Sequence, residues 1–256
     1  MTLPAIDPNA FYIFSIPIKW YGISYALGLL FGCFYAAKTI KKLPGKANIK
    51  DIDNLLIWVA LGVIVGGRLG YVLFYNFSYF SNYPLEIVTG IRKGGMSFHG
   101  GLIGATLAVY FYAKNKSLPF FQIMDSVASA APIGIFFGRL ANFINGELWG
   151  RITNVPWAII FPNAGNEPRH PSQIYEAILE GILLFFILYF YSNKKKLYKP
   201  GMLSGIFLVF YSLARIFSEF HREPDIHIGY LFGEITMGML LSFPMVLLGI
   251  YILKKK

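Results

Sequence analysis

Charged residues are scarce in this 256-residue chain. Asp, Glu, Lys and Arg together make up 14% of it, against about 25% in a soluble domain. Hydrophobic residues make up 55%, and several apolar runs exceed the roughly 18–20 residues that cross a bilayer. These proportions exclude an ordinary soluble domain. They predict an all-α integral membrane protein with a single membrane domain, residues 1–256.

Cysteine and the usual cofactor signatures are also lacking. The one cysteine, Cys33, lies inside the first apolar run and cannot form an intramolecular disulfide. We expect it to be a small packed side chain rather than a nucleophile. Metal-ligand spacings such as HxxxH and CxxC are absent, as are the Walker A and dinucleotide-binding fingerprints. The sequence therefore predicts neither a metal site nor a cofactor.

Seven membrane-spanning helices are expected from the apolar runs. They lie near residues 20–37, 53–76, 97–113, 119–142, 173–192, 202–220 and 228–253. The N-terminus has no basic segment before an apolar core, so we expect no cleavable signal peptide. Residues 143–172, with Trp149 and Trp157, are expected to form a small cap over one end of the bundle. Glycines four residues apart, as in Gly66/Gly70 and Gly100/Gly104, predict close helix packing.

Lysines gather at alternate connections between the expected helices. Fourteen of the sixteen follow the first, third, fifth or seventh helix: Lys38, Lys41, Lys42, Lys46, Lys50, Lys114, Lys116, Lys194, Lys195, Lys196, Lys199, Lys254, Lys255 and Lys256. Basic residues are enriched in cytoplasmic loops, so the N-terminus is expected outside and the C-terminus in the cytoplasm. The net charge of +10 thus indicates topology rather than nucleic-acid binding.

The arginines do not follow the lysines. All seven lie away from the expected cytoplasmic side: Arg68, Arg92, Arg139, Arg151, Arg169, Arg215 and Arg222. The orientation of the chain in the membrane explains where the lysines lie, but it does not explain where the arginines lie. Arginine is the residue suited to bidentate contacts with phosphate or carboxylate groups.

Polar side chains within the expected spans fall almost entirely in the outer halves of their helices. They are Trp20, Tyr21, Tyr25, Arg68, His99, Arg139, Asn142, Gln173, Tyr175, Glu176, Glu180, Tyr211, Arg215, Glu219 and Glu234, with Asp125 near an inner end as the exception. Ionisable residues inside spans are costly and are functional candidates. Two interpretations stay open, a structural ion-pair network and a binding site for an anion such as a phospholipid headgroup.

Six segments give the chain a resemblance to a known family. They are WYGISY (20–25), GGRLGYVLFYN (66–76), GGMSFHGGLIG (94–104), GRLANFINGELWGR (138–151), RHPSQIYEA (169–177) and YSLARIFSEFHREPD (211–225). In these segments, and in their order along the whole chain, the sequence resembles the prolipoprotein diacylglyceryl transferases. One departure is Lys19, where members usually carry arginine before WYG. Lysine keeps the positive charge but not the bidentate geometry.

The resemblance implies an activity, a location and a set of site residues. Members transfer the diacylglyceryl group of phosphatidylglycerol to the lipobox cysteine of prolipoprotein signal peptides, and release glycerol 1-phosphate. They are seven-helix enzymes of the bacterial cytoplasmic (inner) membrane whose active site faces the outer leaflet. Their partners are therefore phosphatidylglycerol, prolipoproteins and membrane lipids, with no nucleic acid. By motif the resemblance assigns function to Tyr21, His99, Arg139, Asn142, Glu147, Gly150, Tyr211, Arg215 and Glu219.

The implied reaction breaks a bond between a glyceryl carbon and a phosphate oxygen, so negative charge grows on the departing phosphate. Arg139 and Arg215 are expected to hold the phosphate, with Glu219 orienting Arg215. Tyr21 is expected to hydrogen-bond the headgroup or the ester region. The substrate-binding candidates are Asn142, Glu147, Gly150, Tyr211, Arg68 and Arg222.

The attacking thiol must lose its proton near neutral pH. A free cysteine has a pKa of about 8.5 and histidine about 6.5, so His99 is a candidate general base. Alternatively, His99 only hydrogen-bonds the phosphate or holds a neighbour. Glu147 is the reserve candidate, and a supporting contact with Arg151 or the cap is an equal alternative for it.

A transporter of phospholipids or anions is the rival from another functional class. It would also collect arginines near one leaflet, but it would be expected to continue polar residues to the inner side or to show an inverted repeat. A membrane phosphatase or headgroup transferase is a second rival, and the aspartate-rich signature of the CDP-alcohol transferases is missing.

Overall fold

The computed structural model describes residues 2–4, 6–91, 94–194, 196–224 and 229–255. Six helices in these ranges are long and apolar enough to cross a membrane. They are α1 (Trp20–Ile40), α2 (Ile49–Phe74), α6 (Phe120–Ile144), the continuous helix Ser172–Asn193, α9 (Met202–Glu219) and α10 (Met237–Lys255). The chain is therefore a largely helical membrane protein. Of the lysines and arginines of the sequence, Arg92, Lys93, Lys195 and Lys256 lie outside the described ranges.

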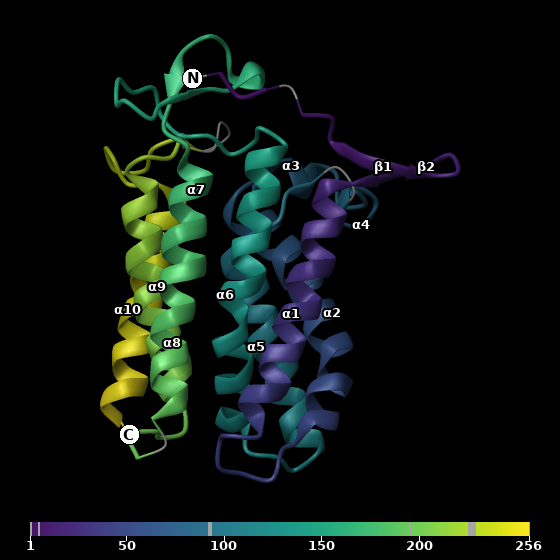
Figure 1. Cartoon of the computed structure of the whole chain (residues 1–256), viewed down its shortest axis with the longest axis vertical. Coiled ribbons are helices and arrows are strands. Elements are labelled where there is room, and N and C mark those ends of the chain that lie inside the picture. The colour runs from purple at the N-terminus through teal and green to yellow at the C-terminus, as the bar shows by residue number, and fades with distance from the viewer. Residues whose placement is uncertain (1, 5, 92–93, 195, 225–228, 256) are drawn as a thin grey trace.

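The expected helix near residues 97–113 is present as α5 (Phe98–Asn115) but is not one of those six. It opens with a histidine and two glycines and closes with lysine and asparagine, so it is less apolar than its neighbours. Figure 1 shows α5 running beside α2 and α6 within the bundle. Seven spanning helices were expected, and the described residues contain six helices that are long and apolar enough. The seventh expected helix is α5.

The helix Ser172–Asn193 changes its winding partway along. It consists of α7 (Ser172–Glu176), a π-helix η3 (Ala177–Leu183) and α8 (Leu184–Asn193). Single turns of π-helix occur frequently at functional sites. This one carries the fully buried Glu180 and follows directly on the fully buried Glu176.

The last helix begins later than expected. Residues 229–236 form a turn in which Leu231 pairs with Ile235, and Gly229 and Gly233 have φ values of 63° and 95°. These left-handed conformations suit glycine and cannot continue a right-handed helix. The expectation that Glu234 enters the last helix is therefore wrong.

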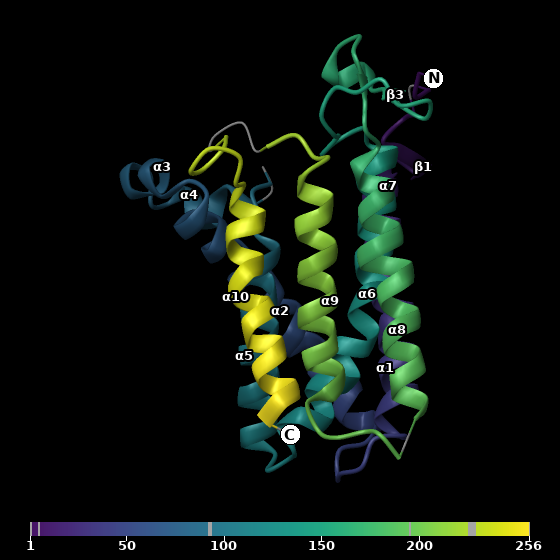
Figure 2. The ribbon, with the colours of Figure 1, turned by 90° about the vertical axis from the view of Figure 1, so that its left-hand side faces the viewer.

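Several short elements lie at the end of the bundle where the chain begins, called the upper end here and drawn at the top of Figure 1. They are β1 (Asn9–Ile13), β2 (Ile16–Lys19), α3 (Phe77–Asn82), α4 (Glu86–Thr89), β3 (Ile159–Ile160), η2 (Pro162–Ala164) and β4 (Pro168–Arg169). β1 and β2 form a hairpin that projects sideways. The segment between α6 and α7 rises above the helices (Figure 2). The C-terminus lies at the lower end.

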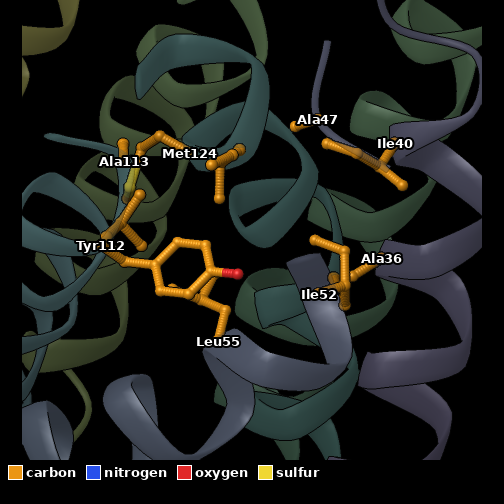
Figure 3. Close-up of a cluster of buried hydrophobic side chains, with 11 residues drawn as sticks. Ala36, Ile40, Ala47, Ile52, Leu55, Tyr112, Ala113 and Met124 are labelled. Carbon is orange, nitrogen blue, oxygen red and sulfur yellow. The ribbon is translucent and has the colours of Figure 1, made fainter. Parts of the chain in front are cut away.

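A buried apolar cluster fills the lower part of the bundle between α1, α2, α5 and α6 (Figure 3). Its members include Ile40, Leu55, Tyr112 and Ile123, all at most 3% exposed. A second cluster joins α6, α8, α9 and α10. Burying apolar side chains within the bundle fixes how the helices pack below the polar upper half.

Asp125 is a fully buried acidic side chain at the lower end. Its carboxylate on α6 accepts hydrogen bonds from the Tyr198 hydroxyl (2.8 Å), the Gly201 amide (2.7 Å), and the Ser204 amide (2.8 Å) and hydroxyl (2.6 Å). Free amides at a helix start require acceptors. Asp125 supplies them, and so ties α6 to the beginning of α9.

Glycines bring α2 and α5 into close contact. A Cβ atom added to Gly66 would lie 2.8 Å from the Gly104 Cα atom, and one added to Gly100 would lie 2.8 Å from the Gly70 Cα atom. These separations are too short for real Cβ atoms, so only glycine permits this approach. The small-residue spacing predicted such packing, and here it is confirmed.

Gly104→Ala is expected to destabilise the protein by about 1–3 kcal/mol, because the methyl group would push α5 away from α2. Thermal unfolding in detergent measures the change. Gly134→Ala on α6 is the matched control, because a Cβ atom there meets nothing within 4 Å. Equal stability of the two variants would contradict the close packing of α2 and α5.

Candidate active site

Arg139, near the upper end of α6, is paired with two buried glutamates. Its Nε atom lies 3.0 Å from Glu176 Oε2, and its Nη2 atom lies 3.2 Å from Glu180 Oε2. Both glutamate side chains are fully buried, and the Arg139 side chain is 13% exposed. α6 and the α7–η3 helix therefore meet through charged groups at this level.

Arg215 on α9 joins the same carboxylates. Its Nη1 atom lies 2.8 Å from Glu176 Oε1 and 3.7 Å from Glu180 Oε1, and its Nη2 atom donates to Glu219. Arg222 Nη1 lies 3.3 Å from Glu176 Oε1. Glu176 therefore contacts three arginines, and we call Arg139, Glu176, Glu180, Arg215, Glu219 and Arg222 the ion-pair cluster.

The ion-pair cluster contains as many acidic as basic side chains. Three arginines face three glutamates, so its formal charges cancel when every group is ionised. Buried charges require such pairing. Of the two interpretations of the polar residues, the structure shows the ion-pair network, and the anion-binding site stays a prediction.

Local sequence explains how the ion-pair cluster forms. Arg215 and Glu219 are one turn apart on α9, so they lie on the same face. Gly181 lets the π-helix approach α6, since a Cβ atom there would lie 2.8 Å from Phe136 Cβ. This approach places the neighbouring Glu180 within reach of Arg139.

Tyr211 lies one turn below Arg215 and is fully buried. Its ring stacks on Phe98 at 4.3 Å and on Phe207 at 5.5 Å between centroids. Its hydroxyl has no hydrogen-bond partner among the described residues. A buried hydroxyl without a partner is unusual and requires an explanation, and a ligand entering between Arg139 and Arg215 would supply one.

His99 opens α5 beside this region. It is 6% exposed, and its Nε2 atom lies 3.3 Å from the Ser242 hydroxyl on α10. It also lies within electrostatic reach of Arg215 and Glu219. The structure therefore brings His99 near the ion-pair cluster without a direct hydrogen bond to it.

Asn142 and Glu147 form a pair above the ion-pair cluster. Asn142 Nδ2 donates to Glu147 Oε1 at 2.8 Å, and Gln173 Nε2 donates to the Glu147 carbonyl at 2.6 Å. Glu147 therefore contacts Asn142 rather than Arg151. Tyr21 lies within electrostatic reach of Glu147 and Arg139, and its hydroxyl lies 3.1 Å from that of Tyr25.

Gly150 lies where the cap crosses the end of α9. Its amide donates to the His170 carbonyl at 2.9 Å, and a Cβ atom on it would lie 2.6 Å from His170 Cβ. Gly150 also pairs with Arg222 in an isolated β-bridge. Gly150 thus allows the two backbones to cross closely, and this crossing positions Arg222.

Burial, together with His221 and Arg151, lowers the pKa of His170, whose carbonyl accepts from the Gly150 amide.

Arg68 does not join the ion-pair cluster. Its guanidinium donates to the carbonyls of Glu86 (2.7 Å), Ile87 (2.9 Å), Gly94 (2.7 Å) and Gly95 (3.2 Å). It also lies over the Phe80 ring, 4.9 Å from the centroid. These contacts hold the segment before α5 in place, and the expected substrate contact of Arg68 stays a prediction.

Three residues in or beside the ion-pair cluster were not predicted as site residues, namely Glu176, Glu180 and Arg151. Glu176 and Glu180 were counted among the polar residues, and their spacing of four was the available signal. Arg151 gave no such signal. Its Nε and Nη2 atoms donate to the Arg222 and Glu219 carbonyls at 3.0 and 3.2 Å. It therefore caps the end of α9.

The sequence is similar to one family of known proteins over almost its whole length. The family model of prolipoprotein diacylglyceryl transferase matches residues 8–254. Among similar curated proteins are the phosphatidylglycerol–prolipoprotein diacylglyceryl transferases of Brucella canis, Brucella ovis and Brucella abortus. Each is 49% identical over 98% of this chain and 92% of its own length. The chain therefore belongs to the prolipoprotein diacylglyceryl transferase family.

Proposed function

We propose that this protein transfers the diacylglyceryl group of phosphatidylglycerol to the lipobox cysteine of prolipoprotein signal peptides. The thiol sulfur forms a thioether with the glyceryl carbon, the carbon–oxygen bond to phosphate breaks, and glycerol 1-phosphate leaves. The observation that carries the proposal is the gathering of Arg139, Arg215 and Arg222 at one end of a membrane bundle of this family. This is the first step of lipoprotein maturation.

We further propose that the chain is one membrane domain with seven spanning helices, α5 included. The lysine distribution supports an outside N-terminus and a cytoplasmic C-terminus. On this orientation the upper end faces the outer leaflet of the bacterial inner membrane. The ion-pair cluster then lies near the level of the phospholipid headgroups, and residues 143–172 cover it as a cap.

Arg139 and Arg215 act on the phosphate. Both guanidinium groups are permanently charged and are mostly buried, and in such a setting electrostatic contacts are strong. Glu219 orients Arg215 and is itself held by the Thr236 hydroxyl at 2.7 Å. The cations stabilise the negative charge that grows on the departing phosphate. Asn142, Glu147, Tyr211 and Tyr21 supply polar contacts to the lipid.

His99 is the proposed general base for the thiol. Its imidazole is buried, and the Ser242 hydroxyl, which donates to the Gly238 carbonyl at 2.7 Å, holds one ring nitrogen. A neutral imidazole can accept the thiol proton. Glu147 remains the alternative base, although Asn142 already engages one of its oxygens.

His99→Gln tests the base directly. We expect kcat to fall about 10²–10⁴-fold, and the acidic limb of the pH–rate profile to disappear with the imidazole. The measurement is kcat against pH for the wild type and the variant. An unchanged profile with a modest loss of rate would assign His99 a positioning role instead.

Purified protein mixed with phosphatidylglycerol and a lipobox peptide tests the activity. Glycerol phosphate and a lipid-shifted peptide are the expected products. A matched peptide with serine in place of the lipobox cysteine should give neither product. Absence of both products from the cysteine peptide, beside a working control enzyme, would refute the proposed function.

A further inference from the structure

The ion-pair cluster is neutral without substrate, and this has a consequence for binding an anion. Within the ion-pair cluster, each arginine nitrogen described above faces a glutamate oxygen, with separations of 2.8–3.7 Å wherever a distance is given. A phosphodiester brings one further negative charge to the same place. Buried like charges close together disfavour each other's ionised form. A neutral cluster therefore becomes overcharged unless a carboxylate releases its charge.

The three glutamates differ in how firmly their ionised forms are held. Glu176 contacts Arg139, Arg215 and Arg222. Glu219 accepts from Arg215 and from the Thr236 hydroxyl. Glu176 Oε2 lies 3.0 Å from Arg139 Nε but has no hydrogen-bond partner among the described residues, whereas Glu176 Oε1 accepts from both Arg215 and Arg222. Glu176 and Glu219 therefore each accept two hydrogen bonds.

Glu180 has the poorest supply of donors. One oxygen accepts from Arg139 at 3.2 Å. The other, Oε1, has no hydrogen-bond partner among the described residues, and Arg215 Nη1 lies 3.7 Å from it. A protonated Glu180 would lose the least, because its Oε1 can carry the proton without breaking a hydrogen bond.

The groups that face Glu180 come from several elements. They are Arg139 on α6, Glu176 on α7, and Tyr211 and Arg215 on α9. The fully buried Tyr211 hydroxyl also lacks a partner and lies within electrostatic reach of Glu180. Apart from Glu180, the nearby acid is the firmly held Glu176, so Glu180 is the group able to change its charge.

We propose that Glu180 takes up one proton from water when an anionic phospholipid binds to Arg139 and Arg215. The proton restores neutrality, and the lipid phosphate takes the place that the Glu180 carboxylate held beside Arg139. Glu180 is thus a carrier of charge that pairs with the arginines in the empty protein and is neutral in the lipid complex. This inference rests on the proposed function, since it takes phosphatidylglycerol as the ligand.

Calorimetry can count the proton. Phosphatidylglycerol alone binds without reacting because the thiol acceptor is missing. Titrations at one pH, in two buffers with different ionisation enthalpies, give the number of protons taken up per lipid. We expect about one proton for the wild type and near zero for Glu180→Gln with binding retained. Glu223→Gln is the matched control, because this exposed partner of Arg169 should keep the wild-type uptake.

Binding without proton uptake by the wild type would overturn the inference, and so would full uptake by Glu180→Gln. If Glu180→Gln does not fold, the number of protons that the wild type takes up per lipid still tests the inference. Between about pH 7.5 and 9, where an ordinary histidine is neutral, the Kd for phosphatidylglycerol should rise up to about tenfold per pH unit. A Kd that does not change over this range contradicts the proposal.

The two proposals fail in different ways. Lipid-shifted peptide without coupled proton uptake refutes the role of Glu180 and leaves the transferase intact. Coupled uptake on binding phosphatidylglycerol, without any transfer to the peptide, refutes the transferase and leaves the role of Glu180 in binding an anion.

Discussion

Arg215→Ala is expected to lower kcat/KM for phosphatidylglycerol by about 10²–10³-fold or more. Removing one preorganised donor to a developing negative charge has an effect of this size, and Arg215 offers the phosphate two nitrogens. Its loss also leaves Glu176 and Glu219 short of a partner. Arg215→Lys should recover only part of the rate, because an ammonium group lacks the bidentate geometry. Arg139→Ala should behave in the same way.

Transfer to a lipobox peptide, measured for each purified variant over a range of lipid concentrations, gives these values. Glu223→Ala is the matched control, since the Glu223 side chain is 46% exposed and exposed charges contribute little. It should stay within a few fold of the wild type. Full activity of Arg215→Ala or Arg139→Ala would remove the phosphate contact from the mechanism.

Glu176→Ala should have the largest effect on stability, about 3–5 kcal/mol, because removing one partner of a buried pair leaves uncompensated charge. Glu176 is fully buried and contacts three arginines. Its loss leaves Arg139, Arg215 and Arg222 facing one another with two carboxylates. Thermal unfolding in detergent, followed by circular dichroism, measures the change.

A second substitution tests the cause of that loss. Arg222→Gln in the Glu176→Gln background removes one positive and one negative charge together, so it should restore part of the stability. Glu223→Ala, on an exposed pair, should change it by at most about 1 kcal/mol. A Glu176→Ala protein as stable as the wild type would mean that the ion-pair cluster is not a structural element.

The helices could be predicted from the sequence because bilayer thickness imposes a length on apolar runs. The rule also predicted the helix α5, which is present, although its histidine and glycines make it less apolar and it is not among the six helices long and apolar enough to cross a membrane. It failed at Glu234, since a turn with left-handed glycines replaces the expected helix start. The hairpin β1–β2 was not expected, because its short strands lie outside the apolar runs.

The site was predictable as a set of residues but not as a set of contacts. The positions of Arg139, Arg215 and Glu219 on their helices predicted that they meet at one level. Their pairing with Glu176 and Glu180 depends on the π-helix and on Gly181, and neither the π-helix nor this contact is visible in a hydrophobic pattern. Arg68 looked equivalent to the other arginines, yet backbone carbonyls of residues 86–95 occupy its donors.

The hydrogen bonds of Asp125 have a consequence for the helix bundle. They pin α6 and α9 together at the lower end, directly beside the apolar cluster of Figure 3. The upper ends of the same helices are joined through Glu176, which pairs with Arg139 on α6 and with Arg215 on α9. The two helices are therefore held at both ends by polar contacts of different kinds, hydrogen bonds below and ion pairs above. A substitution in the ion-pair cluster leaves the lower connection in place, so the membrane-embedded bundle keeps one fixed end when the other is altered.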